Sequence, residues 1–236
     1  MQEKQRPDAR TASSRQEEGF LAQSNIFKQL HSTELGELER ITTMTTCPPG
    51  RILYRPGDAG TALFLLHMGN VQLYHLSMDG RKLVTATLHM GAYFGALSLI
   101  GQHTQTSFAE VVESSQIGVV TGHDMEYLLI QRPTIALALL KMLGQRLVQC
   151  EAQLVDTAFK NTSARLAALL LQLARQQGHP TVVEGLSHEE LAERLGVYRE
   201  TVSAALRELK DTGAITLARK HITISQLTLL NELAEA

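Results

Sequence analysis

The sequence predicts an α+β fold in which an N-terminal β-roll of jelly-roll type is joined by one long helix to a C-terminal winged helix-turn-helix. Residues 47–122 alternate apolar and polar side chains and carry turn signals about every eight to twelve residues, as short antiparallel strands do. Residues 134–159 contain no proline and only Gly144, which favours an uninterrupted helix. Residues 187–224 combine two amphipathic helices, a glycine turn and two short strands.

Length and composition are those of a globular chain with two modest domains. The 236 residues are 44% hydrophobic and 19% charged, and no apolar run approaches the ~18 residues of a membrane span. Residues 1–23 are polar, which predicts a disordered tail without the apolar core of a signal peptide, so we expect a cytoplasmic protein. We expect the β-roll over 24–132, the connecting helix over 133–159 and the winged helix-turn-helix over 160–236.

Cysteine and histidine usage argues against a metal centre or cofactor. The two cysteines, Cys47 and Cys150, exclude a four-cysteine zinc site or iron-sulfur cluster on one chain, and Cys150 is interpreted as a small packing residue. The nine histidines show no HxH or HxxxH spacing, which disfavours a metal-dependent β-roll enzyme. We therefore expect no metal, no cofactor and no enzymatic activity.

Within the strand-rich segment, Asp79-Gly80 marks the clearest hairpin. Glycine tolerates the positive φ of a primed two-residue turn, and the return strand alternates Leu83 and Thr85 with Val84. Several hairpins at this spacing indicate a small sandwich or roll.

The long helix carries an apolar seam of the type that pairs two helices in parallel. With Leu140 at position a, Arg146 and Glu151 fall at g and e, where they can pair across a dimer. The alternative is an ordinary amphipathic helix packed on its own domain, because about three heptads are close to the lower limit for a coiled coil. The seam candidates are Leu140, Leu143, Leu147, Cys150 and Leu154.

The helix-turn-helix pattern begins with a capping box, in which Ser187 and Glu190 satisfy each other's backbone amides. Gly196 can adopt the left-handed conformation of a tight turn before the second helix. Apolar residues of that second helix share one face, which leaves a polar face of Arg199, Glu200, Ser203, Ala204 and Arg207. Arginine can donate to guanine and glutamate can accept from cytosine, so this face suits a major groove.

A helical hairpin with a solvated charged face would show the same pattern, and the residues that follow favour DNA recognition instead. Residues 214–217 and 222–224 predict two strands joined by a basic turn that contains Arg219 and Lys220. Such a wing suits contact with DNA phosphates.

The order of these elements resembles the family of the cyclic AMP receptor protein and the Fnr regulators. Residues 94–99 (FGALSL) are similar to the opening of the family's phosphate cassette, and residues 196–202 (GVYRETV) are similar to the start of its recognition helix. The resemblance implies a homodimeric bacterial transcription regulator with a cyclic-nucleotide-binding-like roll, which binds a two-fold symmetric DNA site and contacts RNA polymerase. DNA-contact candidates are Ser187, His188, Tyr198, Arg199, Glu200, Thr201, Ser203, Ala204, Arg207, Arg219 and Lys220.

The cassette departs from the cyclic-nucleotide binders of that family. Ala96 and Thr106 stand where those proteins carry an acid and an arginine, while Ser107 is retained. A cyclic phosphate would lack its charged partner, so we expect cyclic AMP not to be the effector. Pocket candidates, for an unknown small molecule, are Phe94, Gly95, Ala96, Leu97, Ser98, Thr106, Ser107, Cys150 and Glu151. The alternative function is a small-molecule-binding β-roll that does not recognise DNA.

Overall fold

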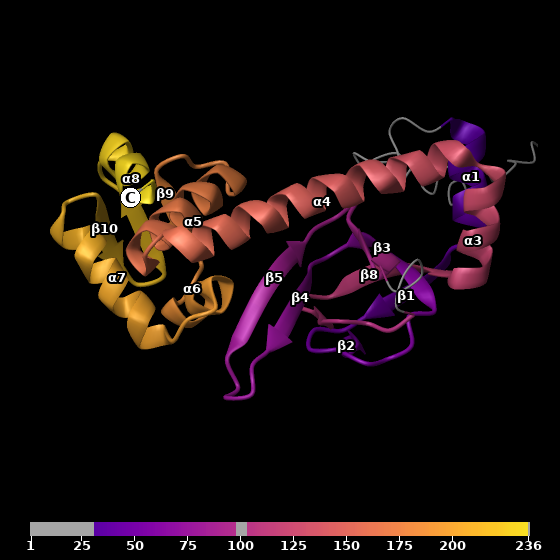
Figure 1. Cartoon of the computed structure of the whole chain (residues 1–236), viewed down its shortest axis with the longest axis horizontal. Helices are drawn as coiled ribbons and strands as arrows, with labels where there is room; N and C mark the ends of the chain where they lie inside the picture. The colour runs from indigo at the N-terminus through magenta and orange to yellow at the C-terminus, as the bar shows by residue number, and fades with distance from the viewer. Residues whose placement is uncertain (1–30, 98–102, 236) are drawn as a thin grey trace, which may run out of the picture. The chain divides into compact units, whose positions relative to one another are not determined.

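The structure is a computed structural model that describes residues 31–97 and 103–235 (Figure 1). The expectations of a disordered tail over 1–23 and of a pocket role for Ser98 lie outside these residues. The chain divides into two compact units, one formed by Met1–Leu73 and Thr87–Gly144 and the other by Tyr74–Ala86 and Gln145–Ala236.

The β-roll consists of two four-stranded sheets with the orders β1-β8-β3-β6 and β2-β7-β4-β5. Strand β8 pairs antiparallel with both β1 and β3, so it is central in the first sheet. The strands are β1 (Thr43–Cys47), β2 (Ile52–Tyr54), β3 (Ala62–Met68), β4 (Val71–Leu76), β5 (Lys82–Leu88), β6 (Tyr93–Phe94), β7 (Phe108–Val111) and β8 (Ser115–Thr121). This architecture confirms the predicted roll.

Helices close one end of the roll and complete its core. Helices α1 (Ser32–Arg40), α3 (Gly122–Gln131) and the start of α4 (Pro133–Phe159) bury Leu38, Met125, Ile135 and Leu139 against strand residues such as Leu63. Burial of these side chains removes apolar surface from water, which is the main favourable term in folding.

The hairpin between β4 and β5 is present, but its turn differs from the predicted one. The Ser77 carbonyl accepts from the Gly80 amide at 3.0 Å, and the Ser77 amide donates to the Arg81 carbonyl at 2.9 Å. Gly80 has φ 84°, whereas Asp79 is not among the residues with positive φ. With Asp79 and Gly80 as the central residues, either primed turn would need a positive φ at Asp79, so this is instead a turn closed by a left-handed glycine.

Helix α4 confirms the long helix expected from the sequence, and most of its apolar side chains are not covered by the chain itself. Only Ile135 and Leu139 are buried within it. The seam residues Leu140, Leu147 and Leu154 are 61–70% exposed, and Leu143 is half-buried. Cys150 is exposed, so its interpretation as a small packing residue is wrong for a single chain.

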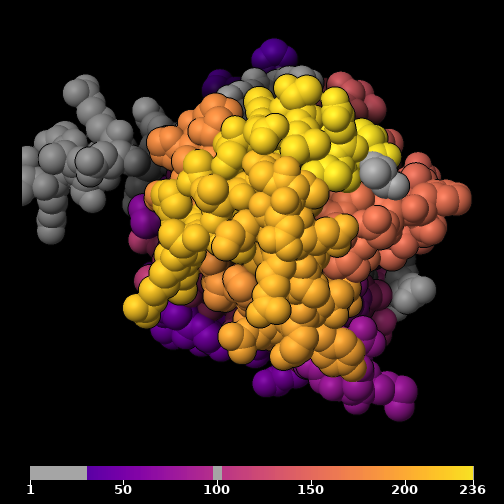
Figure 2. Space-filling model, turned by 90° about the vertical axis from the view of Figure 1, so that its left-hand side faces the viewer, coloured from indigo at the N-terminus to yellow at the C-terminus, as the bar shows by residue number. Residues whose placement is uncertain are grey.

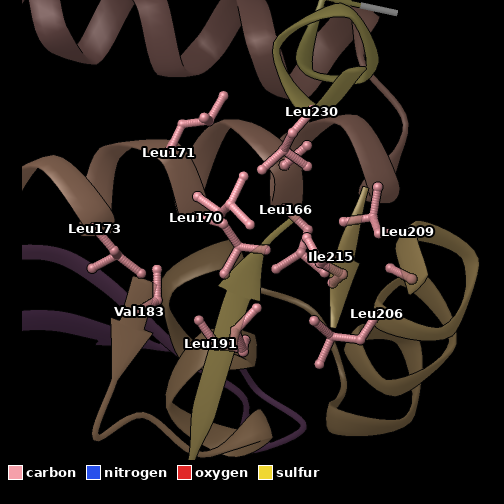
Figure 3. Close-up of a cluster of buried hydrophobic side chains, with 14 of the residues drawn as sticks. Leu166, Leu170, Leu171, Leu173, Val183, Leu191, Leu206, Leu209, Ile215 and Leu230 are labelled. Atoms are coloured by element: carbon pink, nitrogen blue, oxygen red, sulfur yellow. The ribbon is translucent and has the colours of Figure 1, made fainter. Parts of the chain in front are cut away.

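The winged helix-turn-helix has its own leucine-rich core (Figure 3). It contains α5 (Thr162–Gln176), β9 (Val182–Glu184), α6 (His188–Leu195), α7 (Arg199–Asp211), β10 (Ile215–Ala218), β11 (His221–Ile224) and α8 (Leu227–Ala234). Strands β10 and β11 form the predicted wing, and β9 adds a third strand beside β11. Sequence patterns missed α8, whose Leu230 is fully buried in the core.

Replacing Leu170 with alanine should lower the free energy of unfolding of this domain by about 2 to 5 kcal/mol, because the fully buried side chain would leave a cavity in the core. Leu227, which is 44% exposed, is the matched control, and its replacement by alanine should cost less than about 1 kcal/mol. Urea unfolding followed by circular dichroism measures both changes. Equal losses for the two variants would contradict the central place of Leu170.

Candidate DNA-binding interface and effector pocket

Local hydrogen bonds fix the start of α6 and its turn into α7. The Glu190 amide donates to Ser187 Oγ at 3.2 Å, and the Ser187 amide donates to the Glu190 carboxylate at 2.7 Å, so the predicted capping box is confirmed. Partial burial alone would raise the pKa of Glu190, but hydrogen bonds from the Ser187 hydroxyl and amide and the charge of Lys220 lower it overall. Gly196 follows with φ 68°, the left-handed conformation that ends α6.

The burial pattern of α7 decides which of its side chains face outward. Val202, Ala205, Leu206 and Leu209 are buried, as the sequence predicted. The exposed residues of this helix include Arg199, Glu200, Thr201, Ala204 and Arg207. Within the described residues, no ion pair engages the side chains of Arg199, Glu200 or Arg207. Their charges are therefore not paired within the described part of the chain.

Ser203 differs from its neighbours because its hydroxyl is already used within the domain. It donates to the Arg199 carbonyl at 3.0 Å and lies 2.9 Å from Nδ1 of His188. Since a hydroxyl has one proton, the proton of the second contact belongs to His188 Nδ1. Ser203 thus ties α7 to the first turn of α6, which makes it a positioning residue within the predicted contact set.

The wing brings basic side chains toward the same region. Lys220 has φ 51° at the tip between β10 and β11, and both Arg219 and Lys220 are exposed. A depression of about 390 Å³ lies between the wing tip, the first turn of α6 and the start of α7, and its lining includes Ser187, His188, Arg199, Arg219 and Lys220. A helix N-terminus beside basic side chains favours an anion such as a phosphate.

These segments share one part of the surface of the winged helix-turn-helix. In the space-filling view, the orange and yellow atoms that include α7, β10 and β11 form a continuous surface (Figure 2). Around the depression, the structure brings together one predicted contact of α7, Arg199, with those of the α6 start and the wing, although they come from three separate stretches of sequence.

The predicted effector residues are distributed differently. Phe94 is buried in an aromatic cluster, where its ring stacks on Phe64 at 5.0 Å between centroids and lies 6.1 Å from Tyr54. A Cβ at Gly95 would lie 2.8 Å from the Ala62 carbonyl oxygen, so glycine is required there. Phe94 and Gly95 thus have structural roles, which the residue types in the sequence did not reveal.

The other cassette candidates differ in how far they are exposed. Leu97 is 61% exposed, Thr106 is exposed and Ser107 is half-buried. Ala96 is buried and lines a cavity, as described below. Cys150 and Glu151 lie in the exposed part of α4 that belongs to the other compact unit.

A cavity of about 670 Å³ opens beside Ala96 at the helical end of the roll. Its apolar lining includes Leu63, Met125 and Leu139, and its polar lining includes His103, His123 and Glu126. This volume is within the range of small-molecule sites. Sequence analysis missed the three polar residues because no local motif joins them, and only the fold places them together. No group of three His, Cys, Asp or Glu residues in the described part of the chain is arranged to bind a metal ion.

The fold and the outward-facing polar side of α7 indicate a winged-helix DNA-binding protein, and the comparisons agree. Residues 164–233 match the Crp-like helix-turn-helix domain, and residues 44–132 match the cyclic nucleotide-binding domain. None of the helices in the described ranges combines the length and apolar character needed to span a bilayer.

Known proteins similar to this chain are bacterial regulators. The cyclic AMP receptor protein of Thermus thermophilus is 31% identical over 79% of this chain and 86% of that protein. The global nitrogen regulator of Synechococcus elongatus is 32% identical over 74% of this chain and 82% of that protein. The solved structure of the catabolite activator protein of Thermus thermophilus matches this chain with a TM-score of 0.54 and 29% sequence identity. The match covers 90% of this chain and 99% of that chain.

The chain belongs to the Crp/Fnr family of transcription regulators. It carries that family's helix-turn-helix DNA-binding domain together with a β-roll of the cyclic nucleotide-binding type. The alternative of a β-roll module without DNA recognition finds no support among these relatives.

Proposed function

We propose that α7 recognises base edges in the major groove while the wing and the start of α6 bind phosphates. The observation that carries this proposal is the exposed Arg199-Glu200 pair at the first turn of a helix whose other face is locked in the core. Arg199 would donate to a guanine edge and Glu200 would accept from cytosine. Ala204 can offer only a methyl group, so the site should be tolerant, or favour thymine, where this residue faces a base.

Phosphate contacts would come from Arg219, Lys220 and His188 around this depression, whose lining also includes Glu189. Such contacts position a protein on DNA and do not specify sequence. Tyr198 and Thr201 would lie at the edge of the same interface, beside the first turn of α7.

We infer further that the protein acts as a homodimer through α4. Leu140, Leu147 and Leu154 follow the a/d spacing of a two-stranded coiled coil and are uncovered in a single chain. Two copies would place two recognition helices on a two-fold symmetric site, from which the protein would contact RNA polymerase in the cytoplasm.

For the effector, we propose a small molecule other than cyclic AMP, or none. Ala96 and Thr106 supply neither the carboxylate nor the guanidinium that a cyclic nucleotide requires, and Thr106 is exposed. A desolvated phosphate monoanion without a cationic partner is costly to bury.

Glu200→Ala should relax base preference at one symmetric pair of positions, because each good base contact discriminates by about 1 to 3 kcal/mol. Selection from a randomised duplex pool measures this change. Ser203→Ala is the matched control on the same helix and should leave the selected motif unchanged, since the Ser203 hydroxyl is bonded within the domain. Lys220→Asn removes the charge at the wing tip and puts there a residue that tolerates positive φ. It should weaken binding to all DNA sequences alike. The slope of log affinity against log salt concentration should fall by about one phosphate contact. If Glu200→Ala selected the same DNA motif as the wild type, α7 would not be the recognition helix.

Leu147→Glu should convert the dimer to monomers, because it would bury two uncompensated charges at the two-fold axis. Light scattering reports the mass. Val148→Glu adds the same charge at a neighbouring exposed position outside the seam and should leave the dimer intact. A Leu147→Glu protein of dimer mass would show that the seam is elsewhere.

Calorimetry with cyclic AMP at millimolar concentration should show no saturable heat, and the nucleotide should not change DNA affinity. The reason is that Thr106 gives the cyclic phosphate no cationic partner and Ala96 gives the ribose hydroxyl no carboxylate. Saturable binding at micromolar concentration would refute the proposal.

A further inference from the structure

The β4-β5 hairpin belongs to the same compact unit as the winged helix-turn-helix, because Tyr74–Ala86 clusters with Gln145–Ala236. Its tip contacts the residue that precedes the recognition helix. Tyr198, the N-cap of α7, donates its hydroxyl proton to Asp79 Oδ2 at 2.7 Å. The hairpin therefore touches the DNA-recognition elements at the end of α7 that carries Arg199 and Glu200.

Further contacts hold the tip in place. Arg81 pairs with Asp79 at 2.9 Å, and its guanidinium lies 4.9 Å from the centroid of the Tyr198 ring. On the next strand, Lys82 Nζ lies 3.3 Å from a carboxylate oxygen of Glu193 on α6. The hairpin thus reaches both helices of the helix-turn-helix.

The packing extends to the turn between those helices. A Cβ on Gly196 would lie 2.9 Å from Cδ1 of Leu83, so the hairpin side chain already fills that space. An apolar contact, an ion pair, a hydrogen bond and a cation–π contact therefore act at one junction.

This junction lies beside the first turn of α7, the part of the helix that carries Arg199 and Glu200. A depression of about 380 Å³ is lined by Asp79, Gly80 and Arg81 from the hairpin and by Tyr198, Arg199 and Glu200 from the recognition helix and its cap. The major groove admits one helix or one two-stranded ribbon. A hairpin held against the first turn of α7 adds a second element to what would have to fit into that groove.

Charge adds to this steric conflict. Hydrogen bonds from the Ser77 and Tyr198 hydroxyls lower the pKa of Asp79, so its carboxylate is ionised at neutral pH. It accepts from Tyr198 as a phosphate oxygen of DNA would, and it would repel a phosphate brought to the same place.

We propose that the β4-β5 hairpin is an autoinhibitory clasp, in which Asp79 takes the place of a DNA phosphate at Tyr198 and the hairpin and DNA bind α7 in mutually exclusive states. This proposal rests on the DNA-recognition role given to α7 above. Asp79 and Arg81 are 44% and 40% exposed, so their individual contacts are weak and the clasp opens readily. The clasp sets the fraction of molecules that can bind DNA, and the apparent dissociation constant rises in inverse proportion to that fraction.

The test uses the full-length protein and a fluorescein-labelled duplex that the wild type selects from a randomised pool. Asp79→Ala removes the carboxylate and should tighten binding by about three- to tenfold, the gain available when a weak clasp is released. Asp58→Ala is the matched control, since it removes the same charge from another turn of the roll, where Asp58 caps the Arg55 amide at 2.8 Å. It should change affinity by less than about twofold.

A second variant separates release from a general charge effect. Lys82→Glu places a negative charge beside Glu193, which should open the clasp and tighten DNA binding. If the hairpin lay beside bound DNA instead, the loss of a positive charge would weaken binding. Unchanged or weaker binding of either variant overturns the proposal.

Hydrogen exchange gives a readout that does not depend on affinity. Amides of residues 77–86 should exchange faster when the selected duplex is bound and in Asp79→Ala without DNA. Greater protection of this hairpin in the complex would overturn the clasp. A wild-type protein that selects no duplex would instead refute the recognition role of α7, so the two failures are distinguishable.

Discussion

The burial of one face of α7 is the constraint on which the rest of the DNA-binding arrangement depends. Val202, Leu206 and Leu209 enter a core shared with α5, and that packing leaves the helix no freedom to rotate. Arg199 and Glu200 face outward as a consequence of where the leucines go. Gly196 and the capping box then set where the helix begins, so the position of two polar side chains is fixed by apolar packing and backbone conformation.

Features that depend on neighbouring residues were predictable, whereas features that join distant segments were not. The capping box at Ser187, the left-handed Gly196 and the buried face of α7 each follow from a few consecutive residues. The position of the hairpin turn at Asp79 was predicted correctly, but its turn type was not. The same Asp-Gly pair also fits a longer loop, which is closed by hydrogen bonds between Ser77 and residues 80 and 81. Contacts such as Tyr198 with Asp79 join positions 119 residues apart, and no local pattern reports them.

In the cassette, a match to the family pattern does not by itself give a residue its role. Phe94 and Gly95 match the family pattern, yet one fills an aromatic cluster and the other avoids a backbone clash at Ala62. The cavity beside Ala96 receives its polar groups from His103, His123 and Glu126, which lie on other segments. A ligand there would meet imidazoles and a carboxylate beside apolar side chains.

Two independent constraints require that position 196 has no Cβ atom. Its φ of 68° is one that residues with a Cβ rarely adopt, and Leu83 occupies the space where that atom would lie. A residue that tolerated the positive φ would still bring its Cβ too close to Leu83. We therefore expect Gly196 to be replaced very rarely in related chains. Position 83 is bound by only one of these constraints, which leaves it free to exchange among apolar side chains that keep clear of the turn. Related chains should therefore vary at the hairpin while holding the turn constant.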